Sequence, residues 1–212
     1  MALLTILWFL LGVIFTIVNG EFLRFEGQCP KLKPTKESTI SSGNYYAIAE
    51  TKNETTRSDM HLKLQRRGAD SNEYDVVDEF RISDNSDEDC VHIKGLLRTA
   101  KKGKGKLYIV FETEDDETGS LGPVGTRIND LTQSIIFLCY NSQEEDGVFY
   151  GKVLVFRKDP EEFDDEQRKK IENVLKSNKL DFFNEYLSPV AQNNPCSNEE
   201  KKVINFKMIT YK

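Results

Sequence analysis

The feature that most constrains the fold is a series of short segments in which apolar and polar residues alternate. Met60–Leu64 alternates strictly, and Tyr74, Val76 and Phe80 share one parity in the next segment. A period of two is that of a β-strand with one buried face. Polar turns separate the segments, which is typical of an antiparallel sheet and not of alternating strands and helices. Further segments of this kind span Tyr45–Thr51, Cys90–Leu97 and Leu107–Phe111.

Two later segments are apolar on both faces. They are Leu131–Tyr140 and Val148–Phe156, and they flank an Asp146-Gly147 dipeptide, which is a strong hairpin signal. A strand with two apolar faces in an antiparallel series needs another element packed against its outer face.

The segment 165–177 is the expected cover. An acid at 164 or 165 can cap a helix there, and Ile171, Val174 and Leu175 form one apolar stripe. The chain from Asp181 to Cys196 is expected to be irregular, and Val203–Tyr211 is expected to form a late strand.

A sheet built from such a series avoids exposed edges best by closing on itself, so the pattern predicts a mostly-β barrel with the helix outside. A small barrel closed at one end leaves an apolar cavity suited to a small hydrophobic ligand. The same side chains would equally fill a solid core, and periodicity does not separate the two alternatives. The residues expected to face inward are Ala47, Ala49, Leu62, Leu64, Val76, Phe80, Val91 and Ile93.

Met1–Gly20 is almost wholly apolar and ends in a small-residue context, which predicts a cleaved signal peptide and a secreted, extracellular protein. The alternative is a retained membrane anchor, but no basic cluster follows closely enough for a stop-transfer signal. Residues 21–212 would then form one domain, with no stable membrane insertion. Asn53 begins the N-glycosylation triplet Asn53-Glu54-Thr55.

In an oxidising compartment the four cysteines most simply form two disulfides, in any of three pairings. Reactive thiols or a metal site are the alternative, but the cysteines lie far apart and lack histidine neighbours. The cysteines are Cys29, Cys90, Cys139 and Cys196.

Charge and motifs exclude several functions. The chain has 29 basic and 35 acidic residues in an interleaved order, for a net charge of -6, so we expect no nucleic-acid partner. The two histidines, His61 and His92, are not at metal-ligand spacing, and no motif of a hydrolase, P-loop or dinucleotide site occurs. We therefore expect no enzyme activity, no cofactor and no metal.

The motifs of the chain resemble those of the lipocalins, among them the arthropod members related to apolipoprotein D and the insect bilin-binding proteins. Gly43–Ala49 (GNYYAIA) resembles the family motif G-x-W-Y-x-I-A, with Tyr45 in place of tryptophan. Arg157 matches the arginine on the last barrel strand, and Asp130 matches one residue of the second motif. The segment Leu175–Asp181 and the pair Pro195-Cys196 resemble the helix end and last cysteine of the apolipoprotein D branch. The resemblance covers nearly the whole chain and marks it as a divergent member.

The resemblance implies a fold and a set of contacts. It implies an eight-stranded antiparallel up-and-down barrel with a C-terminal helix packed on its outside. It implies disulfides between Cys29 and Cys139 and between Cys90 and Cys196. It also implies that Arg157 packs over Tyr45 and closes the barrel floor beside Gly43, a structural role that we favour over ligand contact.

Asp78 lies on the same alternating positions as Tyr74, Val76 and Phe80, which are expected to face inward, but it carries a charge. A buried carboxylate is costly unless it is paired, and a cationic ligand such as a biogenic amine would pair it. A bulge would instead place Asp78 in water. The leading hypothesis is a secreted, monomeric lipocalin that carries or sequesters a small hydrophobic or amphipathic ligand. The alternatives are a histamine or serotonin scavenger and a protein-interaction role through the loops.

Overall fold

The computed structural model describes residues 22–32, 40–52, 57–84, 87–99, 106–111, 119–120, 125–127, 133–142, 144–160, 163–194, 196 and 201–203. The expected signal segment 1–20, Asn53 and Asp130 lie outside these ranges, as does most of the late strand expected at Val203–Tyr211.

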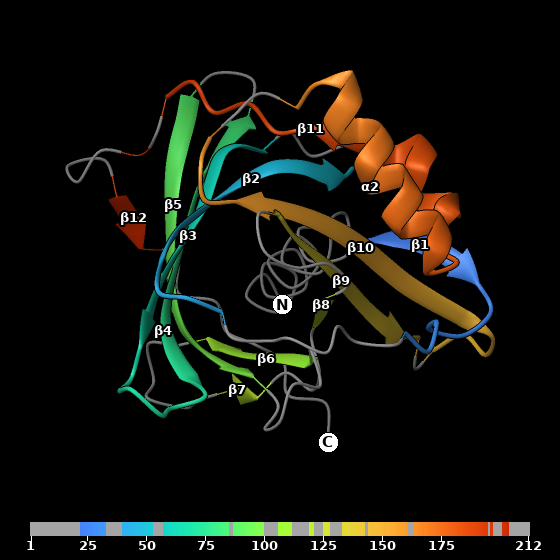
Figure 1. Ribbon diagram of the computed structural model, residues 1–212, viewed down its shortest axis with the longest axis horizontal. Helices are drawn as coiled ribbons and strands as arrows, with labels where there is room; N and C mark the ends of the chain where they lie inside the picture. Colours follow the sequence, from blue (N-terminus) through green and yellow to red (C-terminus); the bar gives the residue numbers. More distant parts are fainter. Residues whose placement is uncertain are drawn as a thin grey trace, which may run out of the picture.

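Within the described ranges, eight antiparallel strands form a closed ring (Figure 1). Each strand pairs with the next, and β10 pairs with β2 to close the sheet, which confirms the expected eight-stranded up-and-down barrel. The ring strands are β2 (Gly43–Thr51), β3 (Arg57–Arg66), β4 (Glu73–Asp84), β5 (Asp87–Thr99), β6 (Lys106–Phe111), β8 (Gly125–Arg127), β9 (Gln133–Asn141) and β10 (Val148–Arg157).

Four short strands attach to this ring. Antiparallel β1 (Leu23–Glu26), β7 (Gly119–Ser120) and β11 (Leu187–Pro189) pair with β10, β6 and β2, and β12 (Lys201–Val203) pairs with β5 in parallel. The segment expected to be irregular thus contains β11 and, before it, the 3-10 helix η1 (Asp181–Tyr186). For β11 the expectation was wrong because its pairing with β2 depends on a distant strand and not on local periodicity; η1 is a short local helix that the sequence analysis did not identify.

The helix α2 (Asp165–Ser177) has the predicted bounds. The side chain of Asp164 accepts a hydrogen bond from the Gln167 backbone N–H at 2.7 Å, which satisfies one free donor of the first turn. Ile171 and Leu175 are fully buried, so the predicted stripe faces the barrel. Figure 1 shows α2 lying across the outside of β10, beside β1.

The apolar side chains divide into two layers. The outer layer joins α2 and η1 to the outer face of the wall, and its buried members are Leu23, Ile48, Ala49, Ile135, Phe137, Val153, Val155, Ile171, Leu175, Leu180, Phe183 and Leu187. The inner cluster lies inside the barrel, and its buried members are Ile40, Tyr45, Ala47, Met60, Leu64, Tyr74, Val76, Phe80, Val91, Ile93, Leu97, Leu154, Phe156 and Val190. The strands β9 and β10 contribute to both layers, which explains why their sequences are apolar on both faces.

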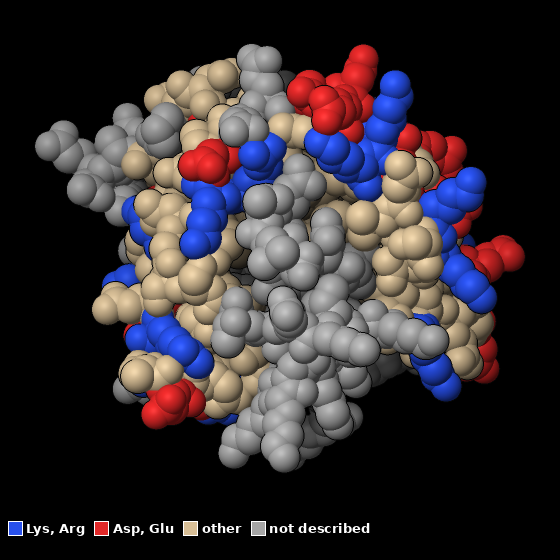
Figure 2. Space-filling view, viewed as in Figure 1, with Lys and Arg blue, Asp and Glu red and all other residues tan. Residues whose placement is uncertain are grey.

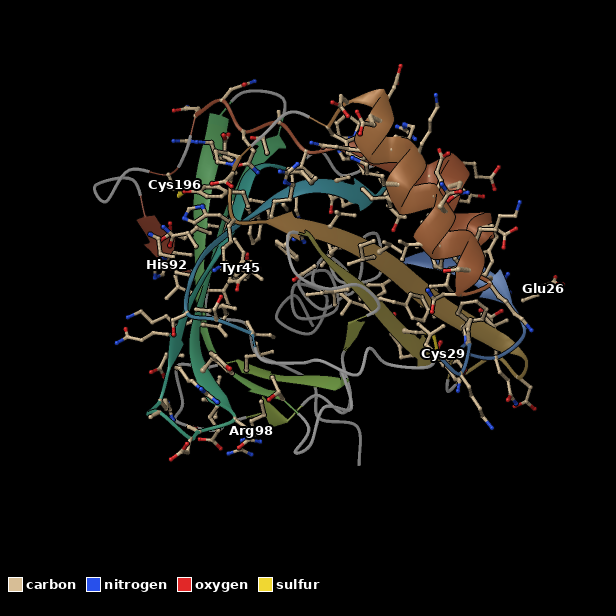
Figure 3. The ribbon with its side chains drawn as sticks, viewed as in Figure 1. Glu26, Cys29, Tyr45, His92, Arg98 and Cys196 are labelled. Carbon is tan, nitrogen blue, oxygen red and sulfur yellow. A yellow bond between two sulfur atoms is a disulfide. The ribbon has the colours of Figure 1, made fainter. Side chains whose placement is uncertain are left out.

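Two disulfides link the chain, Cys29 to Cys139 and Cys90 to Cys196, the pairing that the resemblance implies. Figure 3 places Cys29 and Cys196 on opposite sides of the molecule. On the face drawn in Figure 2, basic and acidic side chains are interspersed over the described surface. Among the described residues, no helix combines the length and apolar character that spanning a membrane requires.

Candidate functional site

The candidate site is the barrel interior, where most of the predicted lining residues meet. Strand pairing places Leu62 opposite Asp78, and Asp78 opposite Ile93, so the three side chains share one face of the sheet. Leu62 packs against the inner cluster and stays partly exposed. Predicted lining residues that are buried in the inner cluster are Ala47, Leu64, Val76, Phe80, Val91 and Ile93.

Ala49 is a correction to the predicted lining. The pairing of β10 with β2 shifts by one residue, so that Phe156 faces Ala47 while Val155 faces Ala49. This β-bulge reverses the parity of β2, and Ala49 packs in the outer layer. The same shift places Glu50 opposite Leu154, a member of the inner cluster, and therefore turns Glu50 inward.

Glu50 forms a buried ion pair inside the barrel. Its Oε2 lies 2.8 Å from Nζ of Lys152, and the two side chains are only 2% and 5% exposed. Lys152 is two residues before Leu154 on β10 and shares its inward parity. Burial lowers the pKa of Lys152, and the neighbouring Glu50 carboxylate acts in the opposite direction. The interior is therefore not wholly apolar.

Asp78 lies inside the barrel and not in water. Burial raises its pKa to about 6, although the positive charges of Arg57 and Lys152 act to lower it. Its Oδ1 is buried and has no hydrogen-bond partner. The Arg57 guanidinium lies 4.3 Å from the centre of the Phe80 ring, and burial lowers the pKa of Arg57. A hydrogen-bond donor brought into the interior would meet the unsatisfied Asp78 oxygen.

The barrel floor is built around Tyr45. Its hydroxyl donates to the Ser41 carbonyl at 2.8 Å, and Gly43 supplies the positive φ of 138° at the start of β2. Nζ of Lys158 lies over the Tyr45 ring, 5.9 Å from its centre. Arg157 stands opposite Tyr46. The expected packing of Arg157 over Tyr45 stays a prediction.

Several interior side chains retain exposure that a solid core would not leave. Ile136 and Leu138 on β9 pack against the inner cluster, yet both are only partly buried. At the end of the same strand, Tyr140 stacks on Tyr150 with ring centres 5.2 Å apart and is 39% exposed. These side chains of β9 therefore keep some exposed surface.

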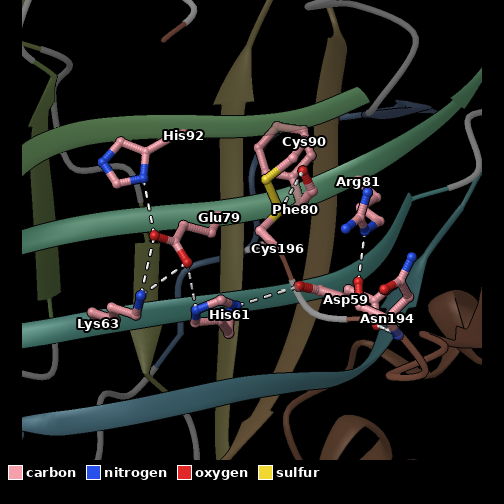
Figure 4. The surroundings of a disulfide bond; sticks show 10 residues. All are labelled: Asp59, His61, Lys63, Glu79, Phe80, Arg81, Cys90, His92, Asn194 and Cys196. Carbon is pink, nitrogen blue, oxygen red and sulfur yellow. Dashed lines mark hydrogen bonds and ion pairs between the residues drawn. A yellow bond between two sulfur atoms is a disulfide. The ribbon is translucent and has the colours of Figure 1, made fainter. Parts of the chain in front are cut away.

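A second polar cluster lies on the outer face of the wall (Figure 4). The side chain of Glu79 is only 1% exposed. Its Oε2 lies 2.8 Å from Nε2 of His61 and 3.0 Å from Nζ of Lys63, and its Oε1 lies 2.9 Å from Nδ1 of His92. The strand register brings the two histidines together, which their sequence spacing does not reveal. The Lys63 ammonium donates to both carboxylate oxygens of Glu79, so it balances the charge of this buried group. Among the described residues, no group of three or more His, Cys, Asp or Glu side chains is placed to hold a metal ion.

Three interior charges were not predicted. Lys152 carries a signal in the sequence, because it shares the alternating parity of Leu154 and Phe156 within an apolar segment. Glu50 has no such signal, since the bulge alone turns it inward. Arg57 lies at the start of β3, where a second shift of register, between Ser58 and His61, hides its parity.

Comparison with known proteins identifies the fold. No family model matches the chain, and no curated protein matches its sequence. Insecticyanin from the tobacco hornworm Manduca sexta has a TM-score of 0.62 and 15% identity over 86% of this chain and 93% of its own. H1 crustacyanin from the lobster Homarus americanus has a TM-score of 0.58 and 14% identity over 80% and 91% of the two chains. Apocrustacyanin C1 has a TM-score of 0.59 and 16% identity over 83% and 94%. These proteins are lipocalins, and the chain has the lipocalin fold.

Proposed function

We propose that this protein with a lipocalin fold is a non-enzymatic carrier that holds a small hydrophobic molecule in its barrel. The observation that supports the proposal is the inner cluster, most of whose apolar side chains come from β2 to β5, β9 and β10. Leu62, Ile136 and Leu138 face this cluster and keep partial exposure. A ligand that covers such surface gains about 25 cal/mol per Å² of apolar area removed from water, before the entropy of association is subtracted.

A fluorescent probe tests this proposal. N-phenyl-1-naphthylamine, a neutral hydrophobic dye, should bind the mature protein with an increase in fluorescence. Leu62→Trp adds bulk inside the barrel and should weaken dye binding at least tenfold, whereas Val77→Trp, on the opposite face of β4, should not change it. Equal effects of the two substitutions, or no binding by the unsubstituted protein, would contradict the proposal.

A cationic amine is the second candidate ligand, because Oδ1 of Asp78 is buried without a hydrogen-bond partner. An ammonium group that lost its hydration beside this carboxylate would gain more than it does in water. Histamine and serotonin should then bind in calorimetry, and Asp78→Asn should reduce their affinity while leaving a fatty acid unaffected. If amine binding is absent, or is unchanged by Asp78→Asn, the cationic ligand is rejected and the neutral hydrophobic ligand remains the proposal.

We also propose that the chain is exported and that residues 1–20 are removed. Two disulfides are consistent with an oxidising compartment, where such bonds persist. Expression of the full chain in insect cells should release a protein that begins at Glu21, as read by N-terminal sequencing. Retention of the intact chain in the membrane fraction would reject this part of the proposal.

A further inference from the structure

The barrel wall has a gap between β2 and β3. These strands pair only where Gly43–Tyr46 faces His61–Leu64, although β2 continues to Thr51 and β3 begins at Arg57. The opposite edge of β2 is occupied by β10, so β2 has nothing from the barrel ring on its β3 side beyond Tyr46. Both strands carry a shift of register in this part, which bends a strand away from its neighbour.

A segment near the C-terminus fills this gap. We name it the strap: residues 187–194 together with Cys196. On one side, the strap pairs with β2, and the backbone N–H of Val190 donates to the Ile48 carbonyl at 3.0 Å. On the other side, the backbone N–H of Asp59 in β3 donates to the Ala191 carbonyl at 2.6 Å. The strap therefore replaces the missing pairing between β2 and β3 by bonding to both.

Side chains of the strap also complete the wall. Gln192 donates from Nε2 to the Ala47 carbonyl at 2.8 Å and to the Met60 carbonyl at 3.1 Å, so one amide group bridges the two separated strands. Val190 is 5% exposed and belongs to the inner cluster. The interior surface at this point consequently comes from the strap and not from a barrel strand.

The far end of the strap is attached to the outside of the wall (Figure 4). The backbone N–H of Asn194 donates to Oδ1 of Asp59 at 2.6 Å, and Nε of Arg81 donates to the Asn194 carbonyl at 2.6 Å. Cys196 is then joined to Cys90 on β5. In addition to the hydrogen bonds, this disulfide ties the end of the strap covalently to the wall.

We propose that the strap is a lateral gate: ligand enters and leaves the barrel between β2 and β3 when the strap lifts, and the Cys90–Cys196 disulfide keeps the gate closed. A short segment attached to two strands by hydrogen bonds and one tether can open locally at a lower free energy than the whole domain unfolds. The tether holds the strap at high effective concentration near the gap and so favours reclosure. The ligand traffic rests on the proposed carrier function, whereas the opening of the strap does not.

The test uses the mature full-length chain and two matched variants. Cys90→Ser with Cys196→Ser removes the tether of the strap, and Cys29→Ser with Cys139→Ser removes the other disulfide as the control. Amide hydrogen exchange at Asp59 and Val190 should accelerate roughly tenfold or more in the first variant relative to the control, because those bonds close the gap. Release of N-phenyl-1-naphthylamine, followed by stopped-flow fluorescence, should accelerate by a similar factor.

A third variant, Gln192→Ala, keeps both disulfides and removes the amide that bridges Ala47 and Met60. It should accelerate hydrogen exchange and dye release by a smaller factor than the cysteine variant does. If the cysteine variant does not fold, this variant alone tests the gate. Unchanged exchange at Asp59 and Val190 would overturn the gate. Faster exchange with unchanged dye release would place the ligand path elsewhere. Absence of dye binding in every form would reject the carrier function, and hydrogen exchange would still decide whether the strap opens.

Discussion

At the scale of single residues, the interior of this barrel combines an apolar lining with a small number of buried charges. Glu50 and Lys152 neutralise each other at 2.8 Å, so their pair leaves little net charge for a ligand. Asp78 differs because one of its oxygens is buried without a hydrogen bond. The cost of burying this carboxylate is therefore not offset by a hydrogen bond at that oxygen.

The raised pKa of Asp78 predicts a pH-dependent cost to stability. The group binds its proton more tightly in the folded than in the unfolded chain, since its pKa rises from 3.8 to about 6 on folding. Its contribution is thus most favourable below pH 3.8, declines as the pH rises to about 6, and is constant above that. At about 1.4 kcal/mol per unit of pKa, Asp78→Asn should stabilise the protein by up to about 3 kcal/mol at pH 7.

Urea unfolding of both proteins between pH 4 and pH 7.5 measures this difference, which should shrink as the pH falls. Asp75→Asn is the control, because Asp75 lies on the same strand and pairs with Arg67 at an exposed position. A gain that is equal at pH 4 and pH 7 would contradict the assignment to Asp78.

Gly151 allows close packing between β10 and η1. A Cβ at this position would lie 2.7 Å from Cζ of Phe183, closer than real contacts allow. Gly151→Ala should therefore destabilise the fold by about 1–3 kcal/mol, as overpacking of a well-packed core does. Chemical denaturation measures the loss, and Phe183→Leu in the same chain should recover part of it by removing the opposing ring atom. Purely additive effects would mean that the two groups do not meet.

At the scale of elements, the position of α2 depends on its first turn and its apolar stripe. Asp164 accepts from the Gln167 N–H, and Ile171 and Leu175 anchor the helix to the outer layer. Asp164→Ala should lower the free energy of unfolding by about 1 kcal/mol, since the N–H of Gln167 loses its partner. Asp165→Ala is the control: it removes a first-turn charge but not the cap, and should cost less. A larger loss for Asp165→Ala than for Asp164→Ala would show that Asp164 is not the residue that caps the helix.

At the scale of the whole molecule, two disulfides fasten the chain in different ways. Their sequence separations are 110 and 106 residues, so both close loops of nearly the same length. Removing either pair should therefore lower the free energy of unfolding by a similar amount, about 4–5 kcal/mol in the chain-entropy account. Guanidinium unfolding of the two double cysteine-to-serine variants measures this. Losses that differ by more than about 2 kcal/mol would show that native contacts, and not loop length, set the value.

The sequence by itself determined most of the long strands and the helix, because each depends on local periodicity; the eight-stranded closure followed from the family resemblance. Alternation fixed which side chains of β3, β4 and β5 turn inward, and Ile171 and Leu175 at helical spacing fixed the buried face of α2. The pairing of the cysteines followed only from the family resemblance.

Only the tertiary structure decided the features that depend on register. One extra residue in β2 moved Ala49 outward and Glu50 inward, and no local pattern marks such a bulge. The meeting of His61 and His92 at Glu79 required the alignment of three strands. The strap acquires its structure from hydrogen bonds to β2 and β3, more than a hundred residues earlier in the chain, so local periodicity carried no signal for it. Parity is a local property, whereas register is set by the partners that a strand finds.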